Sequence, residues 1–178
     1  RADDAHRHRE KAPNARGVRR VLEKFGQVED DAAKAMKGAD AIVLTGNYPS
    51  DWVTAEITKV VGGAFLVLVD TLTTSLVDRA DVVLPGATWI EKAGTFENVD
   101  GRLQAFDRAI DPIDYCKSEA QLALDLVAAR DVTMRPTYNP ANVRQRMATE
   151  HGLSAFVSEV HLPAVEVAVE SDMALQQL

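Results

Sequence analysis

Cysteine is nearly absent from this sequence, since Cys116 is the only one among 178 residues. One thiol cannot close an internal disulfide, complete a four-cysteine zinc site or hold an iron–sulfur cluster by itself. His6 and His8 stand two residues apart near the start, but two histidines without further ligands favour solvated side chains over a zinc site. We therefore expect no metal site in this chain and a reducing environment.

Long apolar runs and an excess of cations are also lacking. No stretch approaches the roughly 18 consecutive apolar residues needed to cross a bilayer. We expect no direct membrane span and a cytoplasmic location, either free or peripheral to the inner membrane through a complex. The 20 lysines and arginines face 27 aspartates and glutamates, a net charge of −7. This balance disfavours nucleic acid as a partner, and the basic stretch 7–20 is interpreted as a solvated tail or a subunit contact.

Short apolar runs alternate with helical patterns in the first two thirds of the chain. Strands are predicted at 39–45, 64–69 and 81–84. A helix at 29–37 precedes the first strand, a second one capped by Ser50 or Asp51 follows it, and a short helical segment is predicted at 71–75. This order implies parallel pairing with right-handed crossovers. The expected fold class is α/β, with a doubly wound, mostly parallel, Rossmann-like sheet.

Two further features follow the third strand. Two extended runs at 95–98 and 102–106 flank Asp100 and Gly101, which predicts a small hairpin because glycine tolerates positive φ. A helix at 118–129 begins with a capping box of Ser118 and Gln121 and carries an apolar stripe of Leu122, Leu126 and Ala129. We divide the chain into a basic segment 1–28, an α/β domain 29–131 and a C-terminal extension 132–178, which contains a helix at 141–150 and serves for docking.

The loops after successive parallel strands gather at one edge of such a sheet, where ligands bind. Gly46 and Asn47 follow the first strand, Asp70 and Thr73 the second, and Glu91 lies beyond the third, so we expect them to cluster. An aspartate can accept hydrogen bonds from a nucleobase or sugar, a glycine lets a phosphate approach closely, and Thr73 offers a hydroxyl at a helix amino end. Asp70 and Thr73 can equally be helix caps.

No catalytic residue emerges from the sequence. Glu91 and Lys92 are adjacent in an extended stretch, so their side chains point opposite ways and a structural or solvated role is favoured over acid–base chemistry. His151 and His161 have no evident acidic or nucleophilic partner, so no triad can be assembled. Cys116 is expected to be a half-buried, unreactive thiol.

The stretch from Ala80 to Gln104 carries a long and specific resemblance. Its parts are Ala-Asp-Val-Val-Leu-Pro at 80–85, Glu-Lys at 91–92, Gly-Thr-Phe at 94–96, Asn98 and Gly-Arg-Leu-Gln at 101–104. Upstream, Pro-Asn-Ala-Arg-Gly at 13–17 and Gly-Asn-Tyr-Pro at 46–49 stand in the same order. Together they resemble the molybdopterin oxidoreductase superfamily over about 13–130, and the resemblance implies the α/β domain that this superfamily names domain III.

The resemblance also implies a ligand and partners. In molybdopterin enzymes the corresponding loops embrace the guanosine part of a molybdopterin guanine dinucleotide, which points to Gly46, Asn47, Asp70, Thr73 and Glu91. The family's metal-ligating residue and cysteine-rich cluster region have no counterpart in 1–178, so iron–sulfur clusters are expected only upstream or in partner chains.

Two branches of the family agree with the motifs. One is the large iron–sulfur subunit of NADH-quinone oxidoreductase, the G subunit of respiratory complex I, whose molybdopterin-like domain typically keeps the fold without the cofactor. The other comprises active formate dehydrogenases and nitrate reductases. We predict a cofactor-free structural portion of a larger redox complex, with its loop residues vestigial. An active molybdenum or tungsten enzyme and a free-standing nucleotide-binding or interaction module stay open as alternatives.

Overall fold

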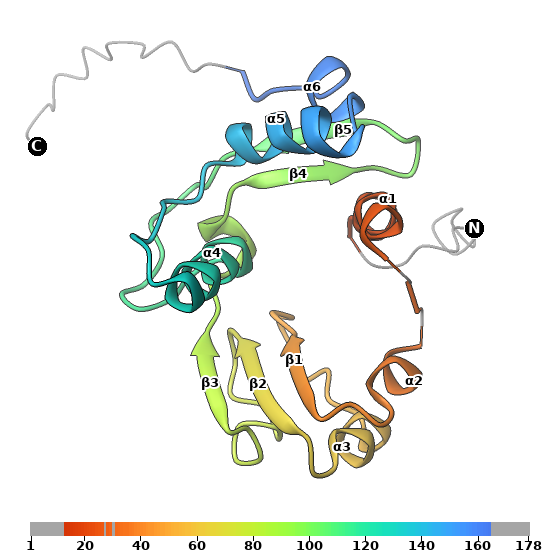
Figure 1. Cartoon of the computed structure of the whole chain (residues 1–178), viewed down its shortest axis with the longest axis vertical. Helices are drawn as coiled ribbons and strands as arrows, with labels where there is room; N and C mark the ends of the chain where they lie inside the picture. Colours follow the sequence, from red (N-terminus) through yellow and green to blue (C-terminus); the bar gives the residue numbers. More distant parts are fainter. Residues whose placement is uncertain (1–12, 27, 30, 165–178) are drawn as a thin grey trace, which may run out of the picture.

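The computed structural model describes residues 13–26, 28–29 and 31–164. Its elements form an open ring in Figure 1, with a parallel sheet on one side and an antiparallel hairpin on the opposite side. Helices α1 and α4 lie between the two, and α5 and α6 lie in front of the hairpin in this view. His6, His8 and residues 165–178 lie outside the described residues.

The parallel sheet consists of β1 (Ala41–Thr45), β2 (Phe65–Asp70) and β3 (Val82–Pro85) in the order β1-β2-β3. Val43 pairs with Val67, and Val67 pairs with Val82, so these three valines form one row across the sheet. The α/β class with a parallel sheet and a small hairpin is confirmed. Among the described strands, spatial order equals chain order.

Helices α2 (Ala32–Met36) and α3 (Ala55–Val61) cover one face of this sheet. Their buried side chains pack against strand residues of that face, and the buried members of this core are Met36, Ile42, Val61, Leu66, Leu68 and Leu76. The expectation that Ser50 or Asp51 caps α3 was wrong. Thr54 is the N-cap, because its hydroxyl accepts from the Ile57 amide at 3.2 Å.

Residues 71–75, predicted as a short helix, form bends, turns and an irregular stretch instead. The Asp70 carboxylate accepts from the Thr71 amide at 2.7 Å and from the Leu72 amide at 3.5 Å. An aspartate that bonds the following amides holds the backbone in an Asx-type turn and competes with helical hydrogen bonding. The threonine-rich pattern alone does not reveal this competition.

The antiparallel hairpin pairs β4 (Gly94–Glu97) with β5 (Leu103–Phe106), close to the predicted positions. Gly101 has φ 79° in the connecting turn, which is the role predicted for a glycine at this point. A 3-10 helix, η2 (Trp89–Glu91), lies between β3 and β4.

Helix α1 (Ala15–Phe25) is attached to the hairpin by side chains from the 13–17 motif and the turn that follows it. The Asn14 carboxamide oxygen accepts from the Glu97 amide at 2.8 Å, and Arg16 donates to the Val99 carbonyl at 2.6 Å. Arg20 forms two hydrogen bonds of 2.7 and 2.6 Å to the buried Glu97 carboxylate. Two sequence motifs that are far apart in the chain therefore meet in space.

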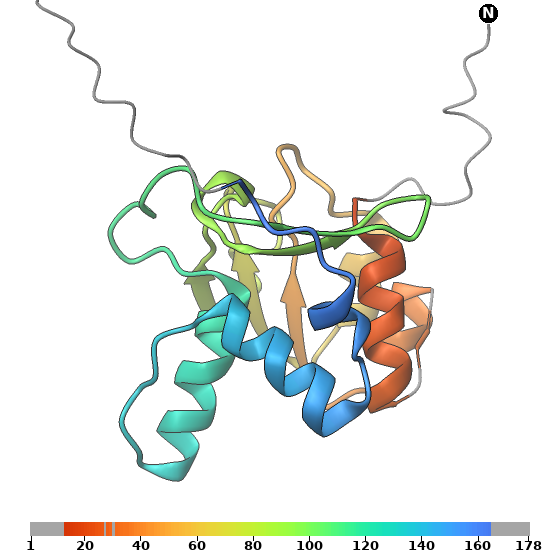
Figure 2. The ribbon, with the colours of Figure 1, turned by 90° about the horizontal axis from the view of Figure 1, so that it is seen from above.

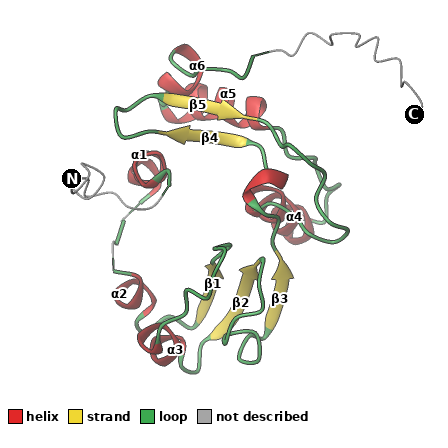
Figure 3. Ribbon diagram, turned by 180° about the vertical axis from the view of Figure 1, so that it is seen from behind, coloured by secondary structure: helices red, strands yellow, loops and turns green. Residues whose placement is uncertain are grey.

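Helices α4 (Glu119–Asp131), α5 (Pro140–His151) and α6 (Ala155–Ser158) complete the structure (Figures 2 and 3). Leu153 and Phe156 form a second core with Leu103 of the hairpin, against which Val21 and Met147 pack. This core draws on all three segments into which the sequence was divided. None of the helices in the described ranges is both long enough and apolar enough to cross a membrane.

Helix α4 begins as predicted but packs differently. Ser118 accepts from the Gln121 amide at 3.2 Å, whereas the Gln121 side chain donates to Asp125 at 2.9 Å and to the Pro136 carbonyl instead of closing a capping box. The predicted stripe of Leu122, Leu126 and Ala129 is also wrong. Leu126 and Ala129 are exposed and Ala128 is the buried residue, so the helix is rotated relative to the expected packing.

Candidate functional site

The carboxyl edge of the parallel sheet is organised by the buried Asp70 at the end of β2. One carboxylate oxygen accepts from the Asn47 amide at 3.0 Å and from the amides of Thr71 and Leu72. The other accepts from the Trp52 indole nitrogen at 2.7 Å. A carboxylate offers about four acceptor positions, and four donors of this chain address them. Asp70 thus ties the loops after β1 and β2 together.

Gly46 lies directly beneath the Trp52 ring. A Cβ atom at this position would overlap the indole nitrogen and its neighbouring carbons, so only glycine leaves room for the ring. The Gly46 amide donates to the Val69 carbonyl at 3.1 Å and extends the ladder between β1 and β2. The close backbone approach predicted for Gly46 is present, but the group that approaches is a side chain of this chain.

Asn47 continues the cluster toward α4. It adopts a left-handed backbone with φ 54°, which asparagine tolerates better than most residues. Its carboxamide nitrogen donates to a Glu119 carboxylate oxygen, to which Lys92 also donates at 2.8 Å. The carboxamide oxygen of Asn47 is buried without a hydrogen-bond partner and lies against Gly86. We call Gly46, Asn47, Trp52, Asp70 and Glu119 the edge cluster.

The charge balance of the edge cluster is set by Glu119 and Lys92. Burial alone would raise the pKa of the Glu119 carboxyl. The hydrogen bonds from Lys92, from its own backbone amide and from Asn47, with the Lys92 charge, outweigh burial, and the pKa lies below its ordinary range. The Glu119 carboxyl is therefore ionised at neutral pH, and its charge lies beside the Lys92 ammonium group.

Thr73 and Glu91, the remaining predicted site residues, do not join the edge cluster through a recorded hydrogen bond. Thr73 is exposed on the 71–75 turns, so the helix amino end proposed for it does not exist. Its neighbour Thr74 is buried, and its hydroxyl has no hydrogen-bond partner. The sequence therefore placed Gly46, Asn47 and Asp70 correctly beside one another and misjudged the surroundings of Thr73.

Glu91 is buried at the end of η2, and its carboxylate joins the start of η2 to the loop after β5. One carboxylate oxygen accepts from the Thr88 amide at 2.6 Å and hydroxyl at 2.7 Å, and the other accepts from the Ile113 amide at 3.2 Å. The hydrogen bonds from Thr88 lower the pKa of Glu91, against the effect of burial. The adjacent Lys92 donates to Glu119 and not to Glu91, so the two neighbours make separate contacts. This agrees with the structural role predicted for Glu91 and Lys92.

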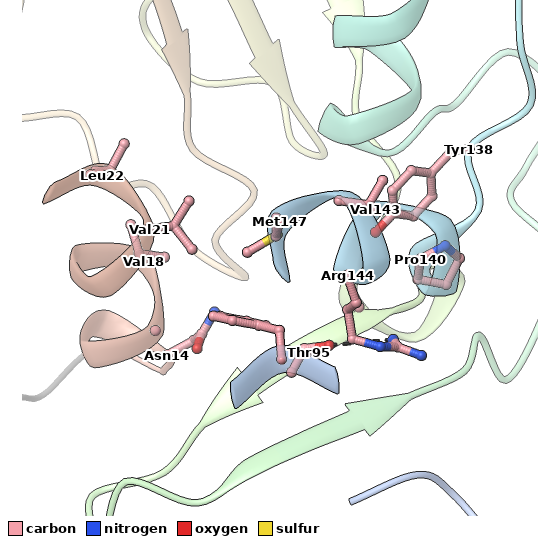
Figure 4. A pocket seen from close by; sticks show the side chains of 13 residues that line it. Asn14, Val18, Val21, Leu22, Thr95, Tyr138, Pro140, Val143, Arg144 and Met147 are labelled. Atoms are coloured by element: carbon pink, nitrogen blue, oxygen red, sulfur yellow. Dashed lines mark hydrogen bonds between the residues drawn. The ribbon is translucent and has the colours of Figure 1, made fainter. Parts of the chain in front are cut away.

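A separate apolar pocket of about 270 Å³ lies between α1, β4 and α5 (Figure 4). Val18, Val21 and Leu22 line it from α1, and Val143 and Met147 line it from α5. Arg144 at its margin donates to the Thr95 hydroxyl at 3.4 Å, and burial raises the pKa of the nearby Tyr138. The pocket can hold apolar atoms, whereas its lining offers no acid–base pair.

Sequence reasoning missed Trp52, Glu119 and Lys92 as members of the polar edge. Glu119 carried one signal, since it is an acidic residue in the first turn of a capped helix. Trp52 carried none, because its contact with Asp70 depends on the course of the 48–54 loop. Among the described residues, no group of three or more histidine, cysteine, aspartate or glutamate side chains could hold a metal ion.

Comparison with known proteins places this geometry in a family context. The model of the family described as molybdopterin oxidoreductase matches residues 18–129, more than half of the chain. The F420-dependent formate dehydrogenase 1 subunit alpha of Methanococcus maripaludis is 37% identical over 87 residues, 47% of this chain. The NADH-quinone oxidoreductase G subunit of Rickettsia felis is 28% identical over 82 residues, 46% of this chain.

A nitrate reductase of Symbiobacterium thermophilum is 34% identical over 62 residues, which is 35% of this chain and 8% of the reductase. The alignments cover 13% of the formate dehydrogenase protein and 12% of the NADH-quinone oxidoreductase protein. The matched region thus spans about an eighth of these two curated relatives.

Proposed function

The chain belongs to the molybdopterin oxidoreductase family, and we propose that it is the structural molybdopterin-like domain of a respiratory electron-transfer subunit. The counterpart in this proposal is the large iron–sulfur subunit, G, of NADH-quinone oxidoreductase. The domain carries no redox centre of its own, and iron–sulfur clusters reside in other parts of the subunit or in partner chains. It works in the cytoplasm, peripheral to the inner membrane through its complex.

The observation that carries the proposal is the engagement of Asp70. A guanine ring would have to donate to a carboxylate whose oxygens already accept from Asn47, Thr71, Leu72 and Trp52. The indole of Trp52 also fills the space above Gly46, where a phosphate would need to approach. The residues present do not suit a pterin guanine dinucleotide in this arrangement. They stabilise the loops of the domain instead, so Gly46, Asn47, Asp70 and Thr73 are vestigial as ligand contacts.

The open second face of the sheet supports a place within a larger polypeptide. Parallel sheets are almost always covered on both faces. Here Val43 is 65% exposed and Phe65 is 51% exposed on the face opposite α2 and α3, next to the partly exposed Val82. We propose that another part of the subunit covers this face, and that 1–28, 29–131 and 132–178 are its three local segments.

A second candidate is a portion of an active molybdenum or tungsten enzyme that binds a pair of molybdopterin guanine dinucleotides. The identities of 37% to a formate dehydrogenase subunit and 34% to a nitrate reductase favour it. In that case Trp52 would have to leave Asp70 when the nucleotide binds. A free-standing nucleotide-binding module would require the same displacement.

Titration of the purified chain with guanosine diphosphate, followed by calorimetry, separates these candidates. The structural role predicts no saturable binding at millimolar nucleotide in the folded chain, and the same result for Trp52→Phe, which frees one Asp70 oxygen. Saturable binding that disappears in Asp70→Asn, with the fold retained by circular dichroism, would contradict the structural role and support a nucleotide site.

A further inference from the structure

Two neighbouring segments of this chain hold large apolar side chains in solvent. Trp89 of η2 is 76% exposed, and Ile113 and Tyr115 in the loop after β5 are 72% and 87% exposed. Ile110 of the same loop is also exposed. The loop projects from the body of the molecule beside α4 in Figure 2. We call Trp89, Ile110, Ile113 and Tyr115 the apolar platform.

The backbone that carries the platform is fastened at several points. The amides of Ala109 and Ile110 donate to the Ile90 carbonyl at 2.8 and 3.4 Å, which ties the loop to η2. The Ile113 amide donates to the buried Glu91 carboxylate, and the Cys116 amide donates to the Ile113 carbonyl at 2.8 Å. Because these bonds hold the segment in shape, the side chains are presented to solvent by a defined loop.

The composition of the platform is typical of the centre of a protein interface. Tryptophan and tyrosine are enriched among residues that dominate binding energy, and interface centres are apolar with a polar rim. Exposed acidic residues alternate with the platform along the loop, namely Asp107, Asp111 and Asp114. Arg108 forms an ion pair with Asp111 at 2.8 Å. Because the other two aspartates have no such partner among the described residues of this loop, the rim is acidic overall.

We propose that the apolar platform docks onto another protein surface of the redox assembly, one with an apolar depression bordered by lysine and arginine side chains. A second copy of this chain does not suit the site. A symmetric contact would bring the same patch of both copies together and place their acidic rims against each other. The inference rests on the proposed membership in a larger assembly, and it is independent of whether the edge cluster binds a nucleotide.

Photo-crosslinking in the native complex tests this docking. Benzoylphenylalanine is introduced in place of Ile113 in the parent polypeptide, and the purified complex is irradiated and analysed by peptide mass spectrometry. The matched control carries the same probe at Val132, which is 91% exposed outside the platform. We expect crosslinks from position 113 to one peptide outside this chain that combines apolar residues with lysine or arginine. Failure to exceed the control, or crosslinks to a second copy or to lipid, would overturn the proposal.

Substitution measures the strength of the contact. Ile113→Asp should lower the yield of assembled complex on native gels at least tenfold, whereas Val132→Asp should change it less than twofold. Asp111→Asn together with Asp114→Asn should weaken the salt dependence of assembly, because the acidic rim then attracts the basic border less strongly. Normal assembly of Ile113→Asp, with its fold intact by circular dichroism, would refute the docking role. Nucleotide binding by the edge cluster would leave all of these outcomes unchanged.

Discussion

At the scale of single residues, Asp70 holds the edge cluster together because its carboxylate accepts hydrogen bonds from four donors of the loops after β1 and β2. In Asp70→Ala, the partly buried amides of Asn47 and Thr71 and the Trp52 indole lose their acceptor. Since an unsatisfied buried group costs ~1–3 kcal/mol, we expect the free energy of unfolding to fall by about 3 kcal/mol or more. Urea unfolding measures the change. Thr73→Ala, three residues away on an exposed turn, serves as the control and should stay within about 0.5 kcal/mol.

The hydrogen-bonded Glu91 carboxylate predicts that the stability of the folded chain falls in acid. Hydrogen bonds from Thr88 lower the pKa of Glu91 in the folded chain. The ionised Glu91 carboxylate therefore stabilises the fold fully above the pKa of an unfolded glutamate, about 4.3. This stabilisation is lost as the pH falls through the lower pKa of Glu91 in the folded chain. The amide resonance of Ile113 should move in this acidic window and stay fixed above it. A flat profile in the wild type, matching that of Glu91→Gln, would contradict the assignment.

The polar edge was predictable from sequence only in part. Gly46, Asn47 and Asp70 could be brought together because carboxyl ends of parallel strands share an edge. Trp52 and Glu119 could not, since their contacts depend on the path of a loop and on the placement of α4. The indole that fills the space above Gly46, and the carboxylate that holds Asn47, thus became visible only in three dimensions.

At the scale of elements, α1 and the hairpin form one unit through Arg20 and Glu97. In Arg20→Ala, the buried Glu97 carboxylate keeps no guanidinium donor. Hydrogen bonds to charged groups contribute ~1.5–3 kcal/mol, and the partly exposed Arg20 places the expected loss toward the lower figure. Hydrogen exchange should show faster exchange in α1 and β4 than in β2. Lys24→Ala, which changes an exposed cation of the same helix, provides the comparison, and equal effects of the two variants would argue against the specific pair.

The strands and the hairpin could be read from the sequence because apolar runs and the Asp-Gly turn are local signals. The 71–75 turns and the rotation of α4 could not. At 71–75 the Asp70 side chain at the end of β2 accepts from amides that a helix would use. In α4 the buried face depends on packing against residues far away in the sequence. The helical pattern therefore failed once against a local side-chain hydrogen bond and once against tertiary packing.

At the scale of the whole molecule, the sheet covered on one face predicts association through the other. We expect the purified chain to bind the dye ANS and to self-associate in gel filtration. Val43→Lys combined with Phe65→Lys should reduce both, because these are the most exposed large apolar side chains of that face. The matched control places lysines at Val132 and Met134, which are exposed in a loop outside the sheet. A double lysine variant of the sheet that behaves like the control would show that the open face is not the associating surface.

The central claim concerns the whole polypeptide, in which this domain has the family's architecture and an edge already occupied by its own side chains. The most direct measurement is the molybdenum, tungsten and guanine nucleotide content of the native parent polypeptide, purified with its complex and analysed by mass spectrometry. We predict less than one tenth of an equivalent of each. Stoichiometric molybdenum or tungsten, accompanied by two guanine nucleotides per polypeptide, would contradict the account.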